Sequence, residues 1–473
     1  MRGRSILGRL FLLAAAALAL LAIAGALAPR QFAASSGADS PILYTVARGY
    51  DPLAWIHGAD RFDAGAMVFV KDSRGRHPLV PDFAASADPA VSFDAENVMF
   101  SGKQKKQDPW QIWEISAAGG KPQRITACAD DCIRPFYLPG NRIVYAKKIE
   151  GRFVVEAATL ADGRATAPVV RLTYGPGNSL PDDVLRDGRI LFEAISAFGA
   201  DGTPELYTIY SDGSGVESYR CDHGKARHAG KQMRSGDIVF ASQSGLGRFT
   251  SALAQEVPIS APAGEYAGDV TETATGDWLV SWRSNANRAF QLMQWTESVG
   301  RPFLSAPVDT LRPAVVEANA NVIQPTPITQ RTIPKRHPSA LHDWPFANLL
   351  CLNAYSSKYK FAEGSIHLVR LYTRDAAGNV KLLGTAPVES DGSFYVQTIG
   401  DQSLQIELLD GSGKTLKREA GWFWMRRGEQ RVCVGCHAGP ETAPENAVPM
   451  ILLKSTTPAD MTGAAMQHSS GGD

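Results

Sequence analysis

Residues 91–126 read VSFDAENVMFSGKQKKQDPWQIWEISAAGGKPQRIT. Two short apolar runs, 98–100 and 112–115, stand on either side of a polar loop, and a Gly119-Gly120 pair follows the second run. Short apolar runs that are bounded by such turn residues indicate β-strands joined by hairpins. Long helical periodicity does not interrupt them. The stretch therefore predicts consecutive antiparallel strands.

The same pattern recurs along the chain. A turn residue and an apolar run lead each time to an aromatic marker, and the markers are Phe100, Tyr145, Phe192, Phe240 and Trp282. The steps between them are 45, 47, 48 and 42 residues, which is the period of a four-stranded propeller blade. Residues 66–69 and the stretch around 308–323 supply a sixth unit, so that strands from both ends close the ring. We therefore predict a mainly β protein with a six-bladed β-propeller over residues 41–324.

The alternative for this part is a β-sandwich with additional hairpins. A proline-rich linker is expected over residues 325–345. Beyond it, residues 346–420 are expected to form a small antiparallel β-domain, because short apolar segments there are separated by Asn-Gly and Asp-Gly turns. The five expected strands are 349–354, 365–372, 380–388, 393–398 and 404–409.

A Cys-x-x-Cys-His run at Cys433, Cys436 and His437 is the attachment signature of a c-type haem. Two thiols at this spacing bond to one porphyrin, and the adjacent imidazole binds the iron. A structural zinc site would need a second pair of ligands, which does not follow in the sequence. A thioredoxin-type dithiol would need a βαβ context. We expect one covalent haem c, with His437 as the proximal iron ligand, in a haem-binding segment over residues 421–455.

Three arginines, Arg426, Arg427 and Arg431, stand directly before the haem box. A guanidinium pairs with carboxylates in bidentate fashion. We expect these side chains to bind the haem propionates or the acidic turns beside them. A solvated basic loop is the alternative.

The distal iron ligand decides between electron transfer at a closed iron and small-molecule chemistry at an open one. His342 and Met450 are the first candidates, followed by Met425 and His367. Residues 456–473 are expected to be a disordered tail, so its side chains (Met461, Met466 and His468) are placed last.

The N-terminus predicts export from the cytoplasm. Arg2, Arg4 and Arg9 precede an apolar stretch over residues 10–28, as in a secretory signal peptide, and the stretch is also long enough for an inner-membrane anchor. Residues 1–40 are therefore expected to be a signal peptide or anchor, with the remainder in the periplasm. The 48 basic and 48 acidic residues cancel, which gives no reason to expect nucleic acid as a partner.

Apart from the haem box, the chain has four cysteines, Cys128, Cys132, Cys221 and Cys351. An even number suits an oxidising compartment. A local disulfide between Cys128 and Cys132 and a pair of free thiols are both open at this point. Cys221 with Cys351 is a pairing by elimination.

Two family resemblances follow from these motifs. Residues 91–126 resemble the TolB-type propeller repeat, in which turn residues lead to a buried strand that ends in Phe and to a Gly-Gly hairpin. The runs at 383–394 and 408–413, with Trp424-Met425-Arg426-Arg427-Gly428-Glu429-Gln430-Arg431 and the haem box, resemble bacterial proteins related to the hydrazine synthase alpha subunit. This second resemblance covers about residues 85–455 and implies a periplasmic c-type haem protein of propeller architecture.

The resemblance does not imply hydrazine synthesis. It implies more than one haem in the synthase subunit, and a tyrosine iron ligand shortly after the active motif, whereas this chain has one haem box and no tyrosine beyond Tyr395. Glu441 is the fourth residue after His437. We therefore expect ordinary ligation by His437.

Two classes of function follow. The first is a monohaem protein for electron transfer, or the haem subunit of a periplasmic oxidoreductase, with a redox partner. The second is a propeller module that binds another protein, in which the haem is structural or sensory. We consider two interpretations of His223 and His228, with Asp222. They are either metal ligands that face the propeller channel or residues of a solvated loop.

Overall fold

The computed structural model describes residues 40–62, 65–195, 202–220, 224–252, 254–296, 310–375, 378–436 and 446–462. The expected signal or anchor over residues 1–39 lies outside these ranges, as do Cys221, His437, Met466 and His468. None of the helices in the described ranges has the length and apolar character that a membrane span requires.

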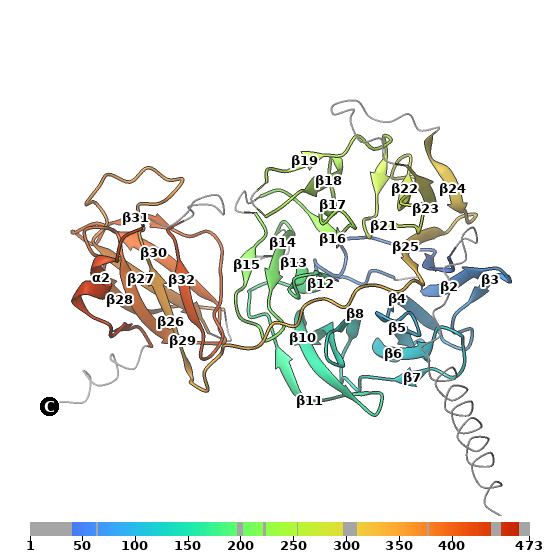
Figure 1. The fold of residues 1–473 in the computed structure, drawn as a ribbon, viewed down its shortest axis with the longest axis horizontal. Helices are drawn as coiled ribbons and strands as arrows, with labels where there is room; N and C mark the ends of the chain where they lie inside the picture. Colours follow the sequence, from blue (N-terminus) through green and yellow to red (C-terminus); the bar gives the residue numbers. More distant parts are fainter. Residues whose placement is uncertain are drawn as a thin grey trace, which may run out of the picture. The chain divides into compact units, whose positions relative to one another are not determined.

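Residues 42–327 form six antiparallel sheets, which Figure 1 shows side by side around a common centre. Three sheets come from the first half of this region: β1(Ile42–Ala47), β2(Ala66–Asp72) and β3(Gly75–Pro78), joined by β25(Asn321–Pro327); β4(Ala85–Val91), β5(Asn97–Lys103), β6(Gln111–Ser116) and β7(Gln123–Arg124); β8(Cys132–Leu138), β9(Arg142–Ile149), β10(Arg152–Ala161) and β11(Arg164–Arg171).

The other three sheets continue in chain order. They are formed by β12(Ser179–Val184), β13(Ile190–Ala194), β14(Glu205–Ile209) and β15(Glu217–Ser218); β16(His228–Gln232), β17(Ile238–Ser242), β18(Gly245–Phe249) and β19(Val257–Pro258); β20(Glu265–Tyr266), β21(Thr271–Glu272), β22(Trp278–Arg283), β23(Gln291–Trp295) and β24(Arg312–Val315).

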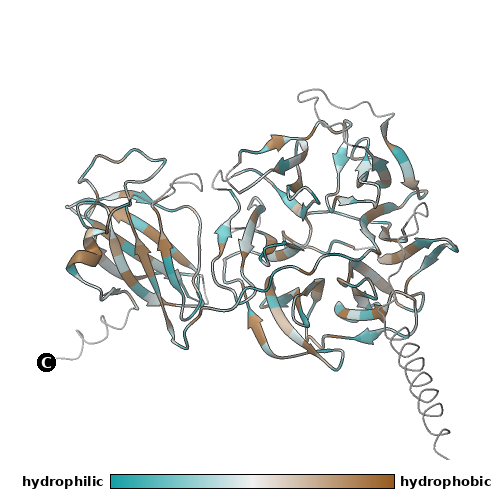
Figure 2. Ribbon diagram, in the orientation of Figure 1, coloured by the Kyte–Doolittle hydropathy of each residue, from teal (hydrophilic) through white to brown (hydrophobic). Residues whose placement is uncertain are grey.

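The repeat markers occupy equivalent places in these sheets. Phe100, Tyr145, Phe192 and Phe240 lie in β5, β9, β13 and β17, the second strand of each sheet from the centre, and all four are buried. Trp282 lies in the corresponding β22 but is only half-buried. Side chains of neighbouring sheets pack together in buried clusters, such as those around Phe192 and Phe240. Figure 2 shows hydrophobic residues along the strands of the sheets. The strands expected from the repeat are therefore confirmed.

Strands from the two ends of the propeller segment meet in one sheet, as expected. β1 pairs with β25 and with β2, so an N-terminal strand lies between a late strand and an early one. The expected closing stretch, 308–323, was partly wrong: β24 joins the preceding sheet, and β25 continues to Pro327, past the expected end of the propeller at residue 324. Prolines are tolerated there because β25 is the edge strand of its sheet.

The centre of the ring is filled from one side by the segment between β1 and β2. Trp55, Ile56 and Phe62 of this segment are buried in a cluster with residues from the innermost strands, such as Ile133 and Leu180. The sequence pattern did not reveal this plug, because it forms no strand or long helix of its own.

Residues 346–462 form a second compact part with two four-stranded sheets. One sheet has the order β32-β26-β29-β33 and the other β28-β27-β30-β31. Their elements are β26(Phe346–Cys351), β27(Leu368–Arg374), β28(Val380–Pro387), β29(Phe394–Ile399), β30(Leu404–Leu409), β31(Thr415–Arg418), β32(Gln430–Cys433), β33(Ala459–Asp460) and the short helix α2(Met450–Lys454). The five expected strands are all present. We call this part the C-terminal domain.

Two expectations for this domain were wrong. The sheet is not wholly antiparallel, because β32 and β33 pair in parallel with β26 and β29. The tail is ordered as far as residue 462, since β33 completes a sheet edge and the adjacent Met461 is fully buried in the domain core. The haem segment is likewise built into this domain through β32.

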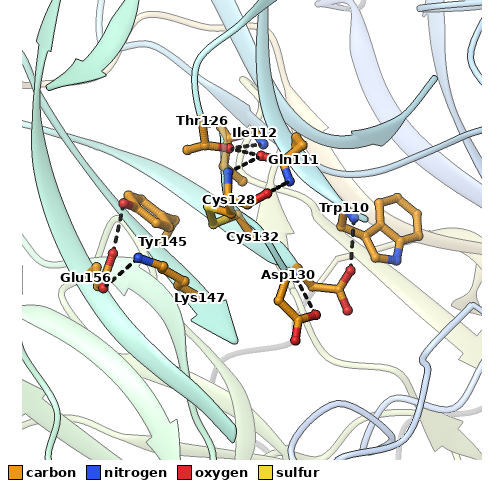
Figure 3. The surroundings of a disulfide bond; sticks show 11 residues. Trp110, Gln111, Ile112, Thr126, Cys128, Asp130, Cys132, Tyr145, Lys147 and Glu156 are labelled. Atoms are coloured by element: carbon orange, nitrogen blue, oxygen red, sulfur yellow. Dashed lines mark hydrogen bonds and ion pairs between the residues drawn. A yellow bond between two sulfur atoms is a disulfide. The ribbon is translucent and has the colours of Figure 1, made fainter. Parts of the chain in front are cut away.

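Cys128 and Cys132 form a disulfide, which decides between the two alternatives left open by the sequence (Figure 3). The loop is held by Gln111, whose Oε1 accepts a hydrogen bond from Cys128 N at 2.8 Å and whose Nε2 donates to Cys128 O at 3.1 Å. Cys351 is a free buried thiol, so its expected pairing with Cys221 was wrong. It lies in the C-terminal domain, beside the haem box.

Candidate functional site

Cys433 is the last residue of β32, an edge strand of the C-terminal domain. β32 lies in parallel register with β26, so that Cys433 is opposite Cys351. The Cys433 side chain is half-buried and packs against the domain core. The preceding Val432 points the other way and is 58% exposed, as the alternation along a strand requires. The first haem-box thiol thus sits at a sheet edge, between core and surface.

Cys436 follows in a bend that leaves the strand. A Cβ at Gly435 would lie 2.1 Å from Ser356 O, so only glycine allows this close passage of the chain. Cys436 Sγ donates to Glu419 Oε1 at 3.6 Å. Burial raises the pKa of the Cys436 thiol to about 12, and the charge of Glu419 adds to this. Burial also raises the pKa of the Cys433 thiol. Neither haem-box thiol is in a disulfide in this structure.

The three arginines before the box are paired with protein groups. Arg426 Nε donates to Asp401 Oδ1 at 2.6 Å, and its Nη1 donates to the carbonyl oxygens of Arg171 and Asp212 in the propeller. Arg431 Nη2 contacts Glu429 Oε1 at 2.6 Å. Arg427 is mostly exposed and lies 3.7 Å from Asp401. Asp401 and Glu429 are thus the acidic partners of these arginines in the described residues.

The segment before the box also connects the two parts of the chain. The Trp424 side chain is buried in a cluster of propeller residues, and its Nε1 donates to Leu172 O at 3.0 Å. Glu429 Oε1 accepts from Gly215 N at 3.2 Å. Arg426 and Glu429 therefore fix the course of the chain into β32, and this role had no signal in the sequence.

The distal candidates lie in different places. His342 is exposed and hydrogen-bonds through its backbone N to Gly428 O, in the turn that precedes β32 and five residues before Cys433. Met450 starts α2, where its N donates to Asp391 Oδ2 at 2.8 Å. The neighbouring Pro449 lines a cavity of about 50 Å³ together with Val434 of the haem box. Met450 is therefore near the haem box, at the C-terminal end of β32. His342 is near the N-terminal end of the same strand.

The remaining candidates are less available. Met425 is fully buried in the domain core, as is Met461. His367 is exposed and packs beside Gly411, at the end of β30.

The surroundings fit a porphyrin in chemical character. Two exposed apolar side chains adjoin the box: Val432, which is 58% exposed, precedes Cys433 in β32, and Val448, which is 62% exposed, lines the small cavity together with Val434. A flat apolar group would remove this surface from water. The donor set for covalent attachment, two unpaired thiols on one short peptide, is also present.

The propeller channel contains a charged network. Arg134 Nη2 lies 2.8 Å from Asp182 Oδ1, and its Nη1 lies 3.5 Å from Glu193 Oε1. Burial raises the pKa of Asp182 well above its usual range, and Glu193 raises it further, while Arg134 lowers it. An adjoining cavity of about 440 Å³ is bordered by the linker residue Arg331. These charges satisfy one another.

His228 lies close to this network and is buried, and burial lowers its pKa. The other two members of the proposed channel cluster, Asp222 and His223, lie outside the described residues. In the part of the chain that the structure describes, no three His, Cys, Asp or Glu side chains are arranged to hold a metal ion.

Comparison with known proteins places the haem box in a known domain. The family model of the hydrazine synthase alpha subunit middle domain matches residues 357–438. Hydrazine synthase subunit alpha of Kuenenia stuttgartiensis is 33% identical over 58 residues, which are 12% of this chain and 7% of that protein.

Solved structures extend the similarity to the fold. Kuenenia stuttgartiensis hydrazine synthase superposes with a TM-score of 0.72 at 17% identity, over 88% of this chain and 72% of that one. TolB from Acinetobacter baumannii gives a TM-score of 0.42 at 15% identity, over 63% of this chain and 67% of that one. The chain is therefore similar to the hydrazine synthase alpha subunit, in sequence around the haem box and in its β-propeller fold over most of its length.

Proposed function

We propose that this chain is an exported monohaem c-type protein, in which Cys433 and Cys436 carry the haem and His437 binds its iron. One observation carries the proposal: the Cys-x-x-Cys-His box ends a domain match, residues 357–438, to the hydrazine synthase alpha subunit middle domain. The two thiols are free, half-buried and surrounded by apolar side chains, which supports the same conclusion. When bound, the haem supplies one-electron chemistry at iron.

The residues around the box have defined tasks in this proposal. Arg426 and Glu429 hold the backbone that leads into β32, so that Cys433 stays at the sheet edge. Met450 is the distal ligand that we favour, because α2 holds it on the side of the box. A protein ligand at that position leaves no exchangeable site, which suits electron transfer.

The propeller serves in this proposal as the platform for a protein partner. We interpret its six sheets as six blades. The relative is named as a subunit, which supports assembly with other proteins, among them a periplasmic redox partner. The residues before position 40 provide export or an inner-membrane anchor. Hydrazine synthesis is not proposed, because the sequence similarity spans only 7% of that relative.

The test is covalent haem on the full chain, matured with the periplasmic haem attachment machinery. Thioether bonds persist through denaturation, so a haem-stained band is expected after denaturing electrophoresis. The double variant Cys433→Ala/Cys436→Ala is expected to lose the stain, while Cys351→Ser, a matched change at the nearby thiol, is expected to keep it. Stain of equal intensity in the double variant would overturn the assignment.

A further inference from the structure

Three thiols lie together at one end of the C-terminal domain. Cys351 ends β26 and Cys433 ends β32, and the two residues are in-register partners in a parallel pairing. A backbone hydrogen bond from Leu352 N to Cys433 O, at 2.9 Å, continues the ladder past this pair. The third thiol, Cys436, follows three residues later. Only Cys433 and Cys436 belong to the haem box.

The pairing places Cys351 within bonding range of Cys433. Neighbouring strands lie about 4.7–4.9 Å apart, and a disulfide requires Cα atoms about 4.4–6.8 Å apart. In-register residues on adjacent strands point to the same face of the sheet. Both side chains meet the same domain core: Cys351 is 3% exposed within it, and Cys433 packs against it. A disulfide also needs Cβ atoms about 3.5–4.5 Å apart, so the two ends of the strands, where the ladder stops, must move slightly closer to join them.

Cys436 packs against the same core, but it has a side-chain partner of its own. Its Sγ donates to Glu419 Oε1 at 3.6 Å, and the bend before it is fixed by the close passage of Gly435 along Ser356. Strand pairing therefore holds Cys351 beside Cys433, whereas Cys436 is held by its contact with the Glu419 carboxylate. This difference favours Cys351.

We propose that Cys351 and Cys433 form a disulfide in the haem-free exported chain. The oxidant is a periplasmic protein that carries an exchangeable disulfide. The more exposed Cys433 attacks that disulfide as a thiolate, forms a mixed disulfide and releases one thiolate of the oxidant. Cys351 then attacks Cys433 Sγ and releases the second. The chain loses two protons and two electrons, and the oxidant becomes a dithiol.

The disulfide has a consequence that rests on the proposed function. A sulfur bonded to Cys351 cannot form a thioether, so a dithiol reductant must free Cys433 before haem is attached. Cys351 would thus hold the haem box in a closed state until reduction. It is a modification site for thiol–disulfide exchange.

The experiment is disulfide mapping of the full chain, exported in cells that lack haem maturation. The protein is quenched in acid, alkylated, digested with trypsin without reduction, and analysed by mass spectrometry. Trypsin places Cys351 in peptide 337–358 and both box cysteines in peptide 432–454. We expect these two peptides to be joined, with Cys436 alkylated. Joining within peptide 432–454, or alkylation of all three thiols, would overturn the proposal.

Matched serine variants identify the bond. Cys436→Ser is expected to keep the joined peptides, and Cys433→Ser is expected to lose them. Loss in Cys436→Ser would overturn the assignment to Cys433. In maturation-competent cells, Cys351→Ser is expected to raise the haem-loaded fraction, and an unchanged fraction would overturn the proposed closed state. Absence of haem from the unmodified chain would defeat the proposed function and leave the disulfide map standing.

Discussion

The propeller buries a guanidinium among carboxylates, whereas the C-terminal domain brings free thiols together at a sheet edge. In the propeller, Arg134 pairs with Asp182 and Glu193 from a different sheet. In the C-terminal domain, Cys351 and Cys433 are partners in register but are not bonded. Buried charges that are paired with one another hold strands in place. In the C-terminal domain the buried Cys351 thiol lies beside the half-buried Cys433 thiol at the sheet edge. The charged network around Arg134 therefore stabilises the propeller, whereas the reactive groups in our proposal are the thiols of the C-terminal domain.

Removing Arg134 tests the propeller side of this comparison most strongly. Arg134→Met removes the guanidinium that lies 2.8 Å from the buried Asp182, although Arg61 remains 3.8 Å from Glu193. Breaking a buried pair in this way costs about 4 kcal/mol of unfolding free energy. Arg427→Met, at an exposed arginine, is the matched control and is expected to change stability by about 0.5 kcal/mol or less. Denaturant unfolding followed by circular dichroism measures both.

The same variant has a predicted pH dependence. The pKa of Asp182 is raised in the folded protein, first by burial and then by Glu193. A carboxyl with a raised folded pKa favours the folded state at low pH, and this contribution is lost as pH rises through that pKa. The stability deficit of Arg134→Met is therefore expected to be smaller at pH 5 than at pH 8. An equal deficit at both pH values would mean that the network is not ionised as inferred.

Trp424 tests whether the two parts of the chain depend on each other. Its side chain is 4% exposed among propeller residues although it belongs to the segment that leads to the haem box. Trp424→Ala is expected to cost about 3 kcal/mol, because a large buried side chain and its hydrogen bond to Leu172 O are lost. Trp344→Ala, at a half-buried tryptophan, is the control and should cost less. If the two variants melt at the same temperature, the Trp424 side chain does not couple the stability of this segment to that of the propeller.

A smaller effect is expected at the start of α2. Asp391 accepts hydrogen bonds from Ser393 and from Met450 N. Burial acts to raise the pKa of Asp391, but these hydrogen bonds outweigh it and lower the pKa. Asp391→Asn is expected to cost about 1 kcal/mol at pH 7. The cost is expected to shrink as pH falls from about 4, where the unfolded carboxyl binds a proton, towards the lowered pKa of the folded carboxyl. A thermal melt at pH 7 and pH 3.5 compares the two.

The fold could be predicted where each unit repeats a local signal. Phe100, Phe192 and Phe240 are each preceded by a turn and an apolar run, so neighbouring residues alone define those strands. Closure of the ring by strands from both ends of the propeller segment could also be predicted, because the apolar segments at residues 66–69 and 308–323 were left over from the other repeats. The plug around Trp55 carried no such signal, because its burial depends on the ring being formed.

The site could be predicted only as far as its motif. Cys433, Cys436 and His437 are adjacent in sequence, and their spacing indicates the chemistry directly. The pairing of Cys351 with Cys433 joins segments about eighty residues apart in a parallel ladder, which short-range patterns do not encode. The same holds for Arg426, whose partners in the propeller lie more than two hundred residues earlier in the chain.

Intact-mass spectrometry of the matured full chain tests the central claim, that Cys433 and Cys436 of the C-terminal domain carry one covalent haem. We predict that the chain gains the mass of one haem, and that after digestion this mass is found on peptide 432–454. A chain of unmodified mass from cells that load a control c-type cytochrome, or a haem adduct on any other peptide, would contradict the account.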